Sequence, residues 1–412
     1  MKWRILFVDD EPNVLQGLQR MLRGKRDEWD MDFAEGPQAA LKILETKIID
    51  VVISDIRMAG MNGVEFLTKV MEQYPYVARL ALSGQADEQL TLQAVSPVQQ
   101  YLSKPCEAEA LIKTIERICA LRDQVGGKDL MTLVMQLKTI PSIPSLYWEI
   151  VNELNKEEAS LKKIGETISR DVGMTARILQ LVNSAFFGLR REVGDPTHAV
   201  NLLGLDTVKN LVLSIQVFSA YDDLELESFS LDALWHHSMQ TGMFAKDIAK
   251  VQGADRHLVE NSMGAGMLHD VGKLILAANL PAEFGTAVKL AEEKKISIPE
   301  AELATFGATH ASIGAYVLGL WGLPEAVVQA VAWHHSPSEC PNAPSQFSAL
   351  TAVHAANIID HGTGGPEARY PLSEIDTAYI EKLHLSHRLD AWRDLCEGLE
   401  AEASKEEERK AG

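Results

Sequence analysis

The sequence contains no apolar run that approaches the roughly 18 residues of a membrane-spanning helix. It also shows no signal-peptide pattern, because Met1–Arg4 lead directly into the strand-like segment Ile5–Val8 without a small-residue cleavage site. We therefore expect a cytoplasmic protein that does not associate with membranes. Its length of 412 residues is too great for one ordinary hydrophobic core and predicts two or three domains.

Cysteine is scarce, and the spacing of the four cysteines gives no sign of a disulfide framework. Cys106, Cys119, Cys340 and Cys396 are widely separated and form no C-x-x-C pair. In a reducing cytosol, isolated cysteines are most simply packing residues, and a zinc or redox role normally requires closer spacing. We expect all four thiols to be unpaired.

Positive charge is also in short supply. The formal net charge is -19, and residues 1–122 carry 15 Lys and Arg against 18 Asp and Glu, so the remaining residues carry -16. Binding to a phosphate backbone normally requires a basic patch. The second part of the chain also shows no helix-turn-helix or zinc-finger pattern. We therefore expect no direct binding to DNA.

The first 122 residues do contain a regular alternation of strand-like and helix-like segments. The helical segments are amphipathic, as in Pro12–Arg23, where apolar side chains recur at helical spacing. Such alternation predicts an α/β domain with a parallel doubly wound sheet, in which ligands bind at the carboxyl ends of the strands. The five predicted strands are Ile5–Val8, Met31–Ala34, Val51–Ser54, Arg79–Ser83 and Gln99–Ser103.

Reactive polar side chains stand at the ends of these predicted strands. Asp9 and Asp10 end the first strand, Asp55 the third and Ser83 the fourth, and Lys104 follows the fifth. Three carboxylates repel each other unless a cation lies between them, and their hard oxygen ligands favour Mg²⁺. Asp55 is then placed to act as a carboxylate nucleophile that carries an acyl phosphate. The Ser83 hydroxyl and the Lys104 charge would bind the phosphoryl oxygens.

Four short segments contain these residues: VDDE (8–11), SDIRMAGMNG (54–63), LSG (82–84) and YLSKP (101–105). Together they resemble the receiver domain of bacterial response regulators throughout residues 1–122. The resemblance implies a five-stranded parallel sheet of order 2-1-3-4-5. It also implies that Asp55 accepts a phosphoryl group from a sensor histidine kinase.

The same resemblance implies roles for the neighbouring residues. Asp10 and Asp55 would contact Mg²⁺ directly, with the backbone carbonyl of Arg57 as a further ligand and Asp9 assisting.

The resemblance also implies a conformational switch, in which Tyr101 changes its packing when Ser83 moves toward the phosphoryl group. One residue departs from the family pattern. Ala59 stands where the family usually has a proline after Met58. This change alters a loop but removes no chemical group.

The character of the sequence changes after residue 122. The pair Gly126-Gly127 marks a short linker between two domains. Helix after helix follows, which predicts an all-α, bundle-like domain. The expected parts are a linker at 123–130, a helical domain at 131–340, a helical extension at 341–399 and a charged, frayed tail at 400–412.

Histidine is the notable feature of the predicted helical domain. Histidine with aspartate is a ligand set suited to Mn²⁺, Fe or Zn²⁺, and a metal held in this way can activate water for phosphodiester hydrolysis. Histidines in a helical core also commonly do no more than satisfy hydrogen bonds, so both interpretations stay open. The candidate ligands are His237, His269, Asp270, His310, His334 and His335.

Six longer segments carry a second resemblance: IPSIPSLYWEIV (140–151), ISRDVGMTARILQLVNSAFFG (168–188), HAVNLLGLDTVKNLVL (198–213), GAGMLHDVGKLIL (264–276), THASIGAYVLGLWGLPEAVVQAVAWHH (309–335) and VHAANIID (353–360). They resemble the HD superfamily of metal-dependent phosphohydrolases, and specifically its HDOD branch. The N-S-A-F-F-G and L-G-L-x-x-V-K-N patterns belong to that branch. The resemblance implies a regulatory or scaffold module, because HDOD domains are not usually regarded as proven hydrolases.

Two departures bear on the predicted metal site. Asn357 stands where active HD enzymes place a final aspartate, and its neutral amide reduces the charge compensation for two metal ions. The sequence after His335 lacks the glycine-tyrosine-proline motif of cyclic di-GMP phosphodiesterases of the HD-GYP type, so we do not expect that activity. Lys273 could pair with a phosphate, but we expect it to be an exposed helical lysine.

The leading hypothesis is a two-component response regulator whose HDOD domain binds an unknown downstream protein, with a homodimer as one candidate assembly. One alternative is a phosphorylation-gated, metal-dependent phosphohydrolase. Another is an HDOD domain that senses a nucleotide without cleaving it. The sequence leaves enzymatic activity undecided and leans toward none.

Overall fold

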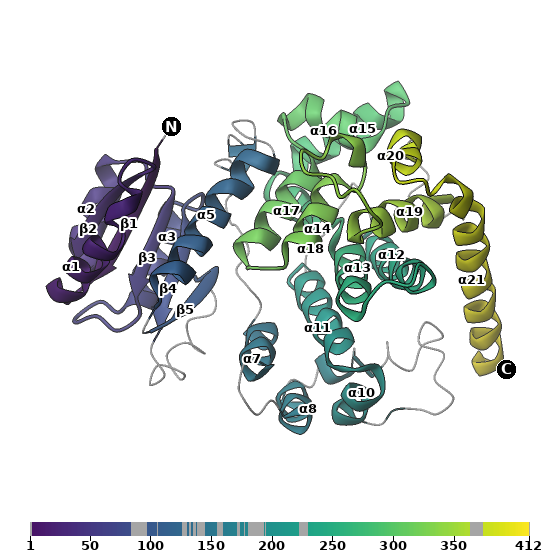
Figure 1. Ribbon diagram of the computed structural model, residues 1–412, viewed down its shortest axis with the longest axis horizontal. Helices are drawn as coiled ribbons and strands as arrows, with labels where there is room; N and C mark the ends of the chain where they lie inside the picture. Colours follow the sequence, from purple (N-terminus) through teal and green to yellow (C-terminus); the bar gives the residue numbers. More distant parts are fainter. Residues whose placement is uncertain are drawn as a thin grey trace. The chain divides into compact units, whose positions relative to one another are not determined.

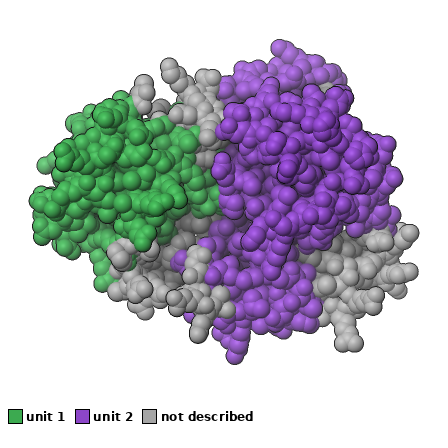
Figure 2. Space-filling model, in the orientation of Figure 1, with its two compact units in different colours: residues 1–145, 316–323 green, residues 146–315, 324–412 purple. Residues whose placement is uncertain are grey.

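The computed structural model describes residues 2–83, 97–104, 106–125, 145–154, 160–170, 195–221, 230–362 and 374–411, with a few short stretches between 130 and 193. The chain forms two compact units, residues 1–145 with 316–323 and residues 146–315 with 324–412 (Figure 2). Within the described residues, no single helix has the length and apolar character needed to cross a membrane. The pair Ile298–Phe306 and His310–Leu320, bent by 79° at the break between them, meets both requirements when its helices are taken together.

The first unit is built on a parallel sheet of five strands (Figure 1). The strand order is β2-β1-β3-β4-β5, which confirms the predicted doubly wound topology. The order reverses between β1 and β3, so the carboxyl ends of these strands form the switch point at which such sheets bind ligands. The strands are β1 (Trp3–Asp9), β2 (Trp29–Glu35), β3 (Val51–Asp55), β4 (Ala78–Ser83) and β5 (Gln100–Ser103).

Helices cover both faces of this sheet, which explains why its strands are apolar along much of their length. Four consecutive residues of β1, from Ile5 to Val8, are each no more than 2% exposed. Leu6 and Val8 share a core cluster with residues of α2 and α3. The described helices of the unit include α1 (Pro12–Met21), α2 (Pro37–Thr46), α3 (Gly63–Gln73) and α5 (Ala108–Val125).

A capping box fixes the start of α3 and thereby the end of the loop that follows β3. The Glu65 N–H donates to Asn62 Oδ1 over 2.9 Å, and the Asn62 N–H donates to Glu65 Oε2 over 3.1 Å. These two bonds satisfy N–H groups that the first turn of a helix leaves without partners. The loop between Asp55 and Asn62 is therefore anchored at both ends.

The described part of the second unit is helical, as predicted (Figure 1). Its central helix, α12 (Leu231–Val251), packs against α13 (Arg256–Leu268) and α19 (Ala349–Gly362). The other described helices of the chain are α7 (Ser145–Leu154), α8 (Leu161–Ser169), α10 (Pro196–Leu203), α11 (Leu205–Ser219), α14 (Val271–Asn279), α15 (Pro281–Lys294), α16 (Ile298–Phe306), α17 (His310–Leu320), α18 (Glu325–Trp333), α20 (Thr377–Lys382) and α21 (Leu389–Ala411).

The structure can be compared with the expected linker, tail and cysteines only where it describes their residues. Helix α5 continues to Val125, inside the predicted linker, while residues 126–129 and the N-S-A-F-F-G segment at 183–188 lie outside the described residues. The predicted charged tail overlaps the end of α21, and its Ala, Glu, Lys and Arg residues favour helix. None of the four cysteines forms a disulfide.

Gly272, in the first turn of α14, allows two backbones to approach closely. A Cβ at this position would lie 1.9 Å from the carbonyl oxygen of His310, a distance that real Cβ atoms essentially never show. Only a residue without a side chain fits here. The close approach brings the start of α17 next to His269 and Asp270, which precede α14.

We expect Gly272→Ala to destabilise the second unit by about 1–3 kcal/mol, the usual cost of overpacking. Gly285 of α15 provides a matched control, because nothing lies within 4 Å of the Cβ that it would gain. Gly285→Ala should be neutral or stabilising by up to about 1 kcal/mol, since alanine favours helix. Calorimetric unfolding of the full-length variants measures both changes, and equal stability of the two would contradict this packing role.

Candidate functional site

The carboxyl ends of β1 and β3 bring three carboxylates together. Oxygen atoms of Asp9, Asp10 and Asp55 all lie within 4.8 Å of one another. Asp9 and Asp55 are 1% and 8% exposed, whereas Asp10 is exposed. Because water screens the two buried charges poorly, the cluster requires positive charge nearby.

Backbone N–H groups orient the two carboxylates that end β1. The Glu11 N–H donates to Asp9 Oδ1 over 2.9 Å, and the Ala59 N–H donates to Asp10 Oδ2 over 2.8 Å. The second bond depends on alanine at position 59, because a proline there would have no N–H to donate. The departure from the family pattern thus adds a contact to the cluster.

Lys104, just after β5, supplies positive charge to the cluster. Its Nζ lies 2.8 Å from Asp55 Oδ1 and 3.3 Å from Asp9 Oδ2. The Ile56 N–H also donates to Asp55 Oδ1, over 2.8 Å. Three carboxylates and one ammonium leave a net negative charge, which suits a divalent cation with oxygen ligands.

The same contacts shift the pKa values of the paired groups. Burial raises the pKa of the Asp55 carboxyl, and the hydrogen bond from Lys104 opposes that shift. Burial would lower the pKa of Lys104, but the hydrogen bond and charge of Asp55 outweigh it and raise the pKa. Lys104 therefore remains charged at neutral pH.

The other predicted residues of this site lie on adjoining strands and the following loop. Ser83 is the last residue of β4 and pairs in register with Ser103 of β5. Tyr101, also in β5, packs against the core cluster shared with α2 and α3, and burial raises the pKa of its phenol. Arg57 is exposed in the loop after β3. The structure therefore gathers the predicted charged side chains at one edge of the sheet.

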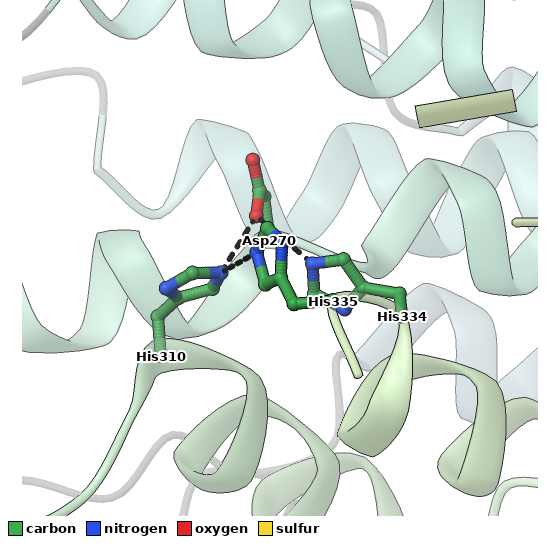
Figure 3. A group of neighbouring side chains, drawn as sticks. All are labelled: Asp270, His310, His334 and His335. Carbon is green, nitrogen blue, oxygen red and sulfur yellow. Dashed lines mark hydrogen bonds and ion pairs between the residues drawn. The ribbon is translucent and has the colours of Figure 1, made fainter. Parts of the chain in front are cut away.

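The second unit gathers a histidine pocket from segments that are far apart in the sequence. Its residues come from α12, from the junction of α13 and α14, from the start of α17 and from the two residues that follow α18. Figure 3 shows the side chains of His310, His334 and His335 around Asp270. The structure brings together all six predicted ligand candidates, which are His237, His269, Asp270, His310, His334 and His335.

Asp270 lies between two halves of this pocket. Its Oδ1 lies 3.1 Å from His310 Nε2 and 3.8 Å from His334 Nε2. The Nε2 atoms of His310 and His335 are 3.0 Å apart. We call Asp270 Oδ1 and these three histidines the His310 half (Figure 3).

The second carboxylate oxygen faces the other two histidines. Asp270 Oδ2 lies 3.3 Å from His269 Nε2 and 3.7 Å from His237 Nε2, and the two Nε2 atoms are 3.1 Å apart. We call this set the His237 half. In a tetrahedral site with metal–ligand bonds of about 2.0–2.2 Å, neighbouring ligand atoms are roughly 3.3–3.6 Å apart. The spacing in both halves is close to that value.

Hydrogen bonds at Nδ1 fix the orientation of the imidazoles. His269 Nδ1 lies 2.7 Å from the carbonyl oxygen of Gly266, and His334 Nδ1 lies 2.8 Å from that of Val331. A carbonyl oxygen only accepts, so the network assigns the proton to Nδ1 and a lone pair to Nε2. Each Nε2 is thus oriented as a metal ligand.

Two buried carboxylates that the sequence analysis missed hold two further imidazoles in the same way. Glu302 Oε2 lies 2.7 Å from His310 Nδ1, and Asp360 contacts His237 Nδ1. No motif marks Glu302, which stands eight residues before His310. Asp360 could have been found, because it ends the VHAANIID segment one helical turn after Asn357.

Lys273 is buried, although an exposed position was expected. The residue is 3% exposed, and its Nζ donates to Asp270 Oδ2 over 2.7 Å. Helix α14 is buried on nearly every side, which leaves no face on which this lysine could reach water. The ammonium therefore lies inside the histidine pocket.

These charges shift several pKa values in the pocket. Burial would raise the pKa of Asp270, but His269 and Lys273 hold it well below its usual value. Burial would lower the pKa of His310, but Glu302 and Asp270 raise it to about 9. Burial, together with His269, lowers the pKa of His334, so this imidazole stays neutral and keeps its lone pair.

Asn357 lies on the face of α19 that meets the pocket. Three residues earlier, His354 Nδ1 donates to the His334 carbonyl over 2.6 Å, and three residues later Asp360 contacts His237. Residues at this spacing share one face of a helix. Asn357 is 1% exposed, and neither amide atom has a hydrogen-bond partner among the described residues.

The donor set fits a transition metal ion. His334 Nε2 is buried and has no hydrogen-bond partner among the described residues. It faces Asp270 Oδ1 at 3.8 Å, and that oxygen pairs with His310 Nε2 at 3.1 Å. Buried polar atoms are normally satisfied, so an unsatisfied imidazole nitrogen next to a buried carboxylate indicates a position for a ligand. Imidazole nitrogens with one carboxylate suit Mn²⁺, Fe or Zn²⁺.

Comparisons with known proteins agree with this division of the chain. Residues 5–116 match the response regulator receiver domain, and residues 140–337 match the HDOD domain. An uncharacterized protein of Treponema pallidum is 30% identical over 221 residues, which cover 53% of this chain and 41% of that protein. The hydrogenase transcriptional regulatory protein HoxA of Cupriavidus necator is 30% identical over 137 residues, or 33% of this chain and 27% of HoxA. The chain thus spans less than half the length of either relative.

Among solved structures, an HDOD domain protein of unknown function from Geobacter sulfurreducens aligns with a TM-score of 0.52 and 22% identity, covering 69% of this chain and 98% of that one. At this identity the likeness concerns the fold alone. Together with the two family matches it confirms both resemblances drawn from the sequence. The chain therefore joins a response regulator receiver domain to an HDOD domain.

Proposed function

We propose that the protein is a response regulator of a two-component phosphorelay and is phosphorylated on Asp55. The observation that carries the proposal is the 2.8 Å contact between Lys104 Nζ and Asp55 Oδ1, beside the carboxylates of Asp9 and Asp10. A buried carboxylate with a charged lysine at hydrogen-bond distance is equipped to accept a phosphoryl group from a sensor histidine kinase.

The charged residues divide the chemistry between them. A carboxylate oxygen of Asp55 attacks the phosphorus of the phosphohistidine on the kinase and forms an acyl phosphate, while the P–N bond breaks and the imidazole leaves with the kinase. Lys104 neutralises charge on the transferred group. Mg²⁺, when held by Asp10, Asp55 and the Arg57 carbonyl with Asp9 assisting, would shield the incoming negative charge.

We infer that the HDOD domain is the output of this signal and acts as a regulatory module that binds a downstream protein. Phosphorylation would draw the Ser83 hydroxyl toward the phosphoryl group and change the packing of Tyr101. The residues beyond 122 carry a net charge of -16, which favours a protein partner or a second copy of this chain over DNA.

Labelling with acetyl phosphate in the presence of Mg²⁺ tests the proposed phosphoacceptor. The wild-type protein should become labelled, whereas Asp55→Asn should not, because an amide is not the required nucleophile. Asp30, an exposed carboxylate of β2, provides a matched control, and Asp30→Asn should be labelled like the wild type. Equal labelling of wild type and Asp55→Asn would refute the assignment.

A second candidate function is a metal-dependent phosphohydrolase activity of the HDOD domain. Five imidazoles surround Asp270, and hydrogen bonds at Nδ1 orient four of them. This arrangement favours a metal-dependent activity. A metal held there would activate a water molecule. A nucleotide sensor would use the same pocket for binding without cleavage.

Metal content and turnover test this second candidate together. We expect the purified protein to retain bound Mn²⁺, and His334→Ala to weaken binding by at least about 10-fold, as is typical when support of a metal site is lost. His236, which is exposed and bonded to the Asp232 carbonyl, provides the control, and His236→Ala should bind like the wild type. A rate of phosphodiester or nucleotide hydrolysis that rises with the amount of bound metal would support the phosphohydrolase. Binding of a nucleotide without turnover would support the nucleotide sensor. A protein that binds neither Mn²⁺ nor any nucleotide and turns over no substrate would refute both.

A further inference from the structure

We propose that Lys273 is the built-in cation of the His237 half, so the pocket takes one transition metal ion, in the His310 half, and not two. The inference rests on the proposed metal site and goes beyond it, because it assigns the number of ions and their place. The main evidence is the 2.7 Å hydrogen bond that Lys273 Nζ donates to Asp270 Oδ2.

Lys273 occupies the one carboxylate oxygen that the His237 half could offer to a metal. Asp270 Oδ2 is the oxygen that faces His269 and His237, at 3.3 and 3.7 Å from their Nε2 atoms. The lysine side chain is 4% exposed and that of Asp270 is 1% exposed. Breaking this pair would leave a buried ammonium next to an incoming cation, which is strongly unfavourable.

Two cations on the same oxygen would also be too close. A metal–oxygen bond is about 2.1 Å long, and Nζ lies 2.7 Å from Oδ2, so the metal and the ammonium would be less than about 5 Å apart. Water cannot screen their repulsion at a site where the surrounding side chains are buried. Lys273 therefore competes directly with a metal in the His237 half.

The His237 half is also the poorer in donors. It offers two imidazoles and one shared carboxylate oxygen, while the His310 half offers three imidazoles and the other oxygen. A fourth ligand for the His237 half would have to come from α19. There Asn357 offers only a neutral amide, and Asp360 is already in contact with His237 Nδ1.

The His310 half has the opposite character. His334 Nε2 is buried without a hydrogen-bond partner among the described residues. Asp270 Oδ1 lies 3.8 Å from it and 3.1 Å from His310 Nε2, whereas Lys273 donates to the other carboxylate oxygen, Oδ2. The Glu302 carboxylate behind His310 Nδ1 adds negative charge to this side, 2.7 Å from the imidazole. Four donors and a supporting carboxylate suit a single tetrahedral ion.

The number of bound ions tests the proposal directly. Tag-free, full-length protein is saturated with Zn²⁺ in excess Mg²⁺, which occupies the receiver carboxylates, then desalted and analysed for zinc per chain. We expect one equivalent for the wild type and two for Lys273→Met. Lys250 provides the matched control, because it forms the same i,i+3 pair with Asp247 at 2.8 Å but is 53% exposed. Lys250→Met should bind one equivalent.

A second pair of variants tests the position of the ion and does not depend on the folding of Lys273→Met. His269→Ala should keep one equivalent of zinc, whereas His334→Ala should lose it, with circular dichroism confirming that both are folded. Two equivalents in the wild type, one in folded Lys273→Met, or loss of zinc in folded His269→Ala would each overturn the inference while leaving the metal site intact. No zinc in the wild type or any variant would overturn the metal-site proposal itself.

Discussion

A buried aspartate paired with a lysine ammonium is the interaction on which both candidate sites depend. Asp55 pairs with Lys104 at 2.8 Å, and Asp270 pairs with Lys273 at 2.7 Å. A buried carboxylate costs several kcal/mol unless an opposite charge lies close to it. Each lysine therefore lowers the energetic cost of burying its aspartate. In each pair the aspartate keeps a second carboxylate oxygen, which can contact a further group.

The two pairs differ in how easily they can exchange partners. The Lys104 side chain is 30% exposed, so it can follow an incoming group and return to water. The Lys273 side chain is 4% exposed and lies on a buried helix, so its ion pair with Asp270 does not readily exchange with water. The exposed Lys104 is consistent with the proposed reversible phosphorylation of Asp55. The buried Lys273 is consistent with an HDOD pocket in which fixed charges determine how many metal ions can bind.

The sequence predicts much of this arrangement, because regular physical rules connect it to the residues. Alternating strands and helices require a doubly wound sheet, and the carboxyl ends of its strands bring Asp9, Asp55 and Lys104 to one edge. The histidines of the second domain could be proposed as ligands from residue type and family resemblance. Their convergence on Asp270 could not be read from spacing alone, because it depends on how the helices pack.

Three features of the histidine pocket depend on the packing of helices and could not be predicted from the sequence. Glu302 carries no motif and reaches His310 only because α16 and α17 meet at a sharp bend. Lysine as a residue type favours exposure, and Lys273 is buried because the packing around α14 covers nearly every side of that helix. Asp360 could be singled out from the VHAANIID segment, but its contact with His237 requires knowing which face of α19 is turned inward.

The central claim is that Asp55 carries the phosphoryl group. The most direct measurement is to reduce the phosphorylated protein with borohydride, which converts an aspartyl phosphate to homoserine, and to locate the product by mass spectrometry. We expect one converted residue, at position 55. Conversion at another carboxylate, or phosphate retained on a histidine with position 55 unchanged, would contradict it.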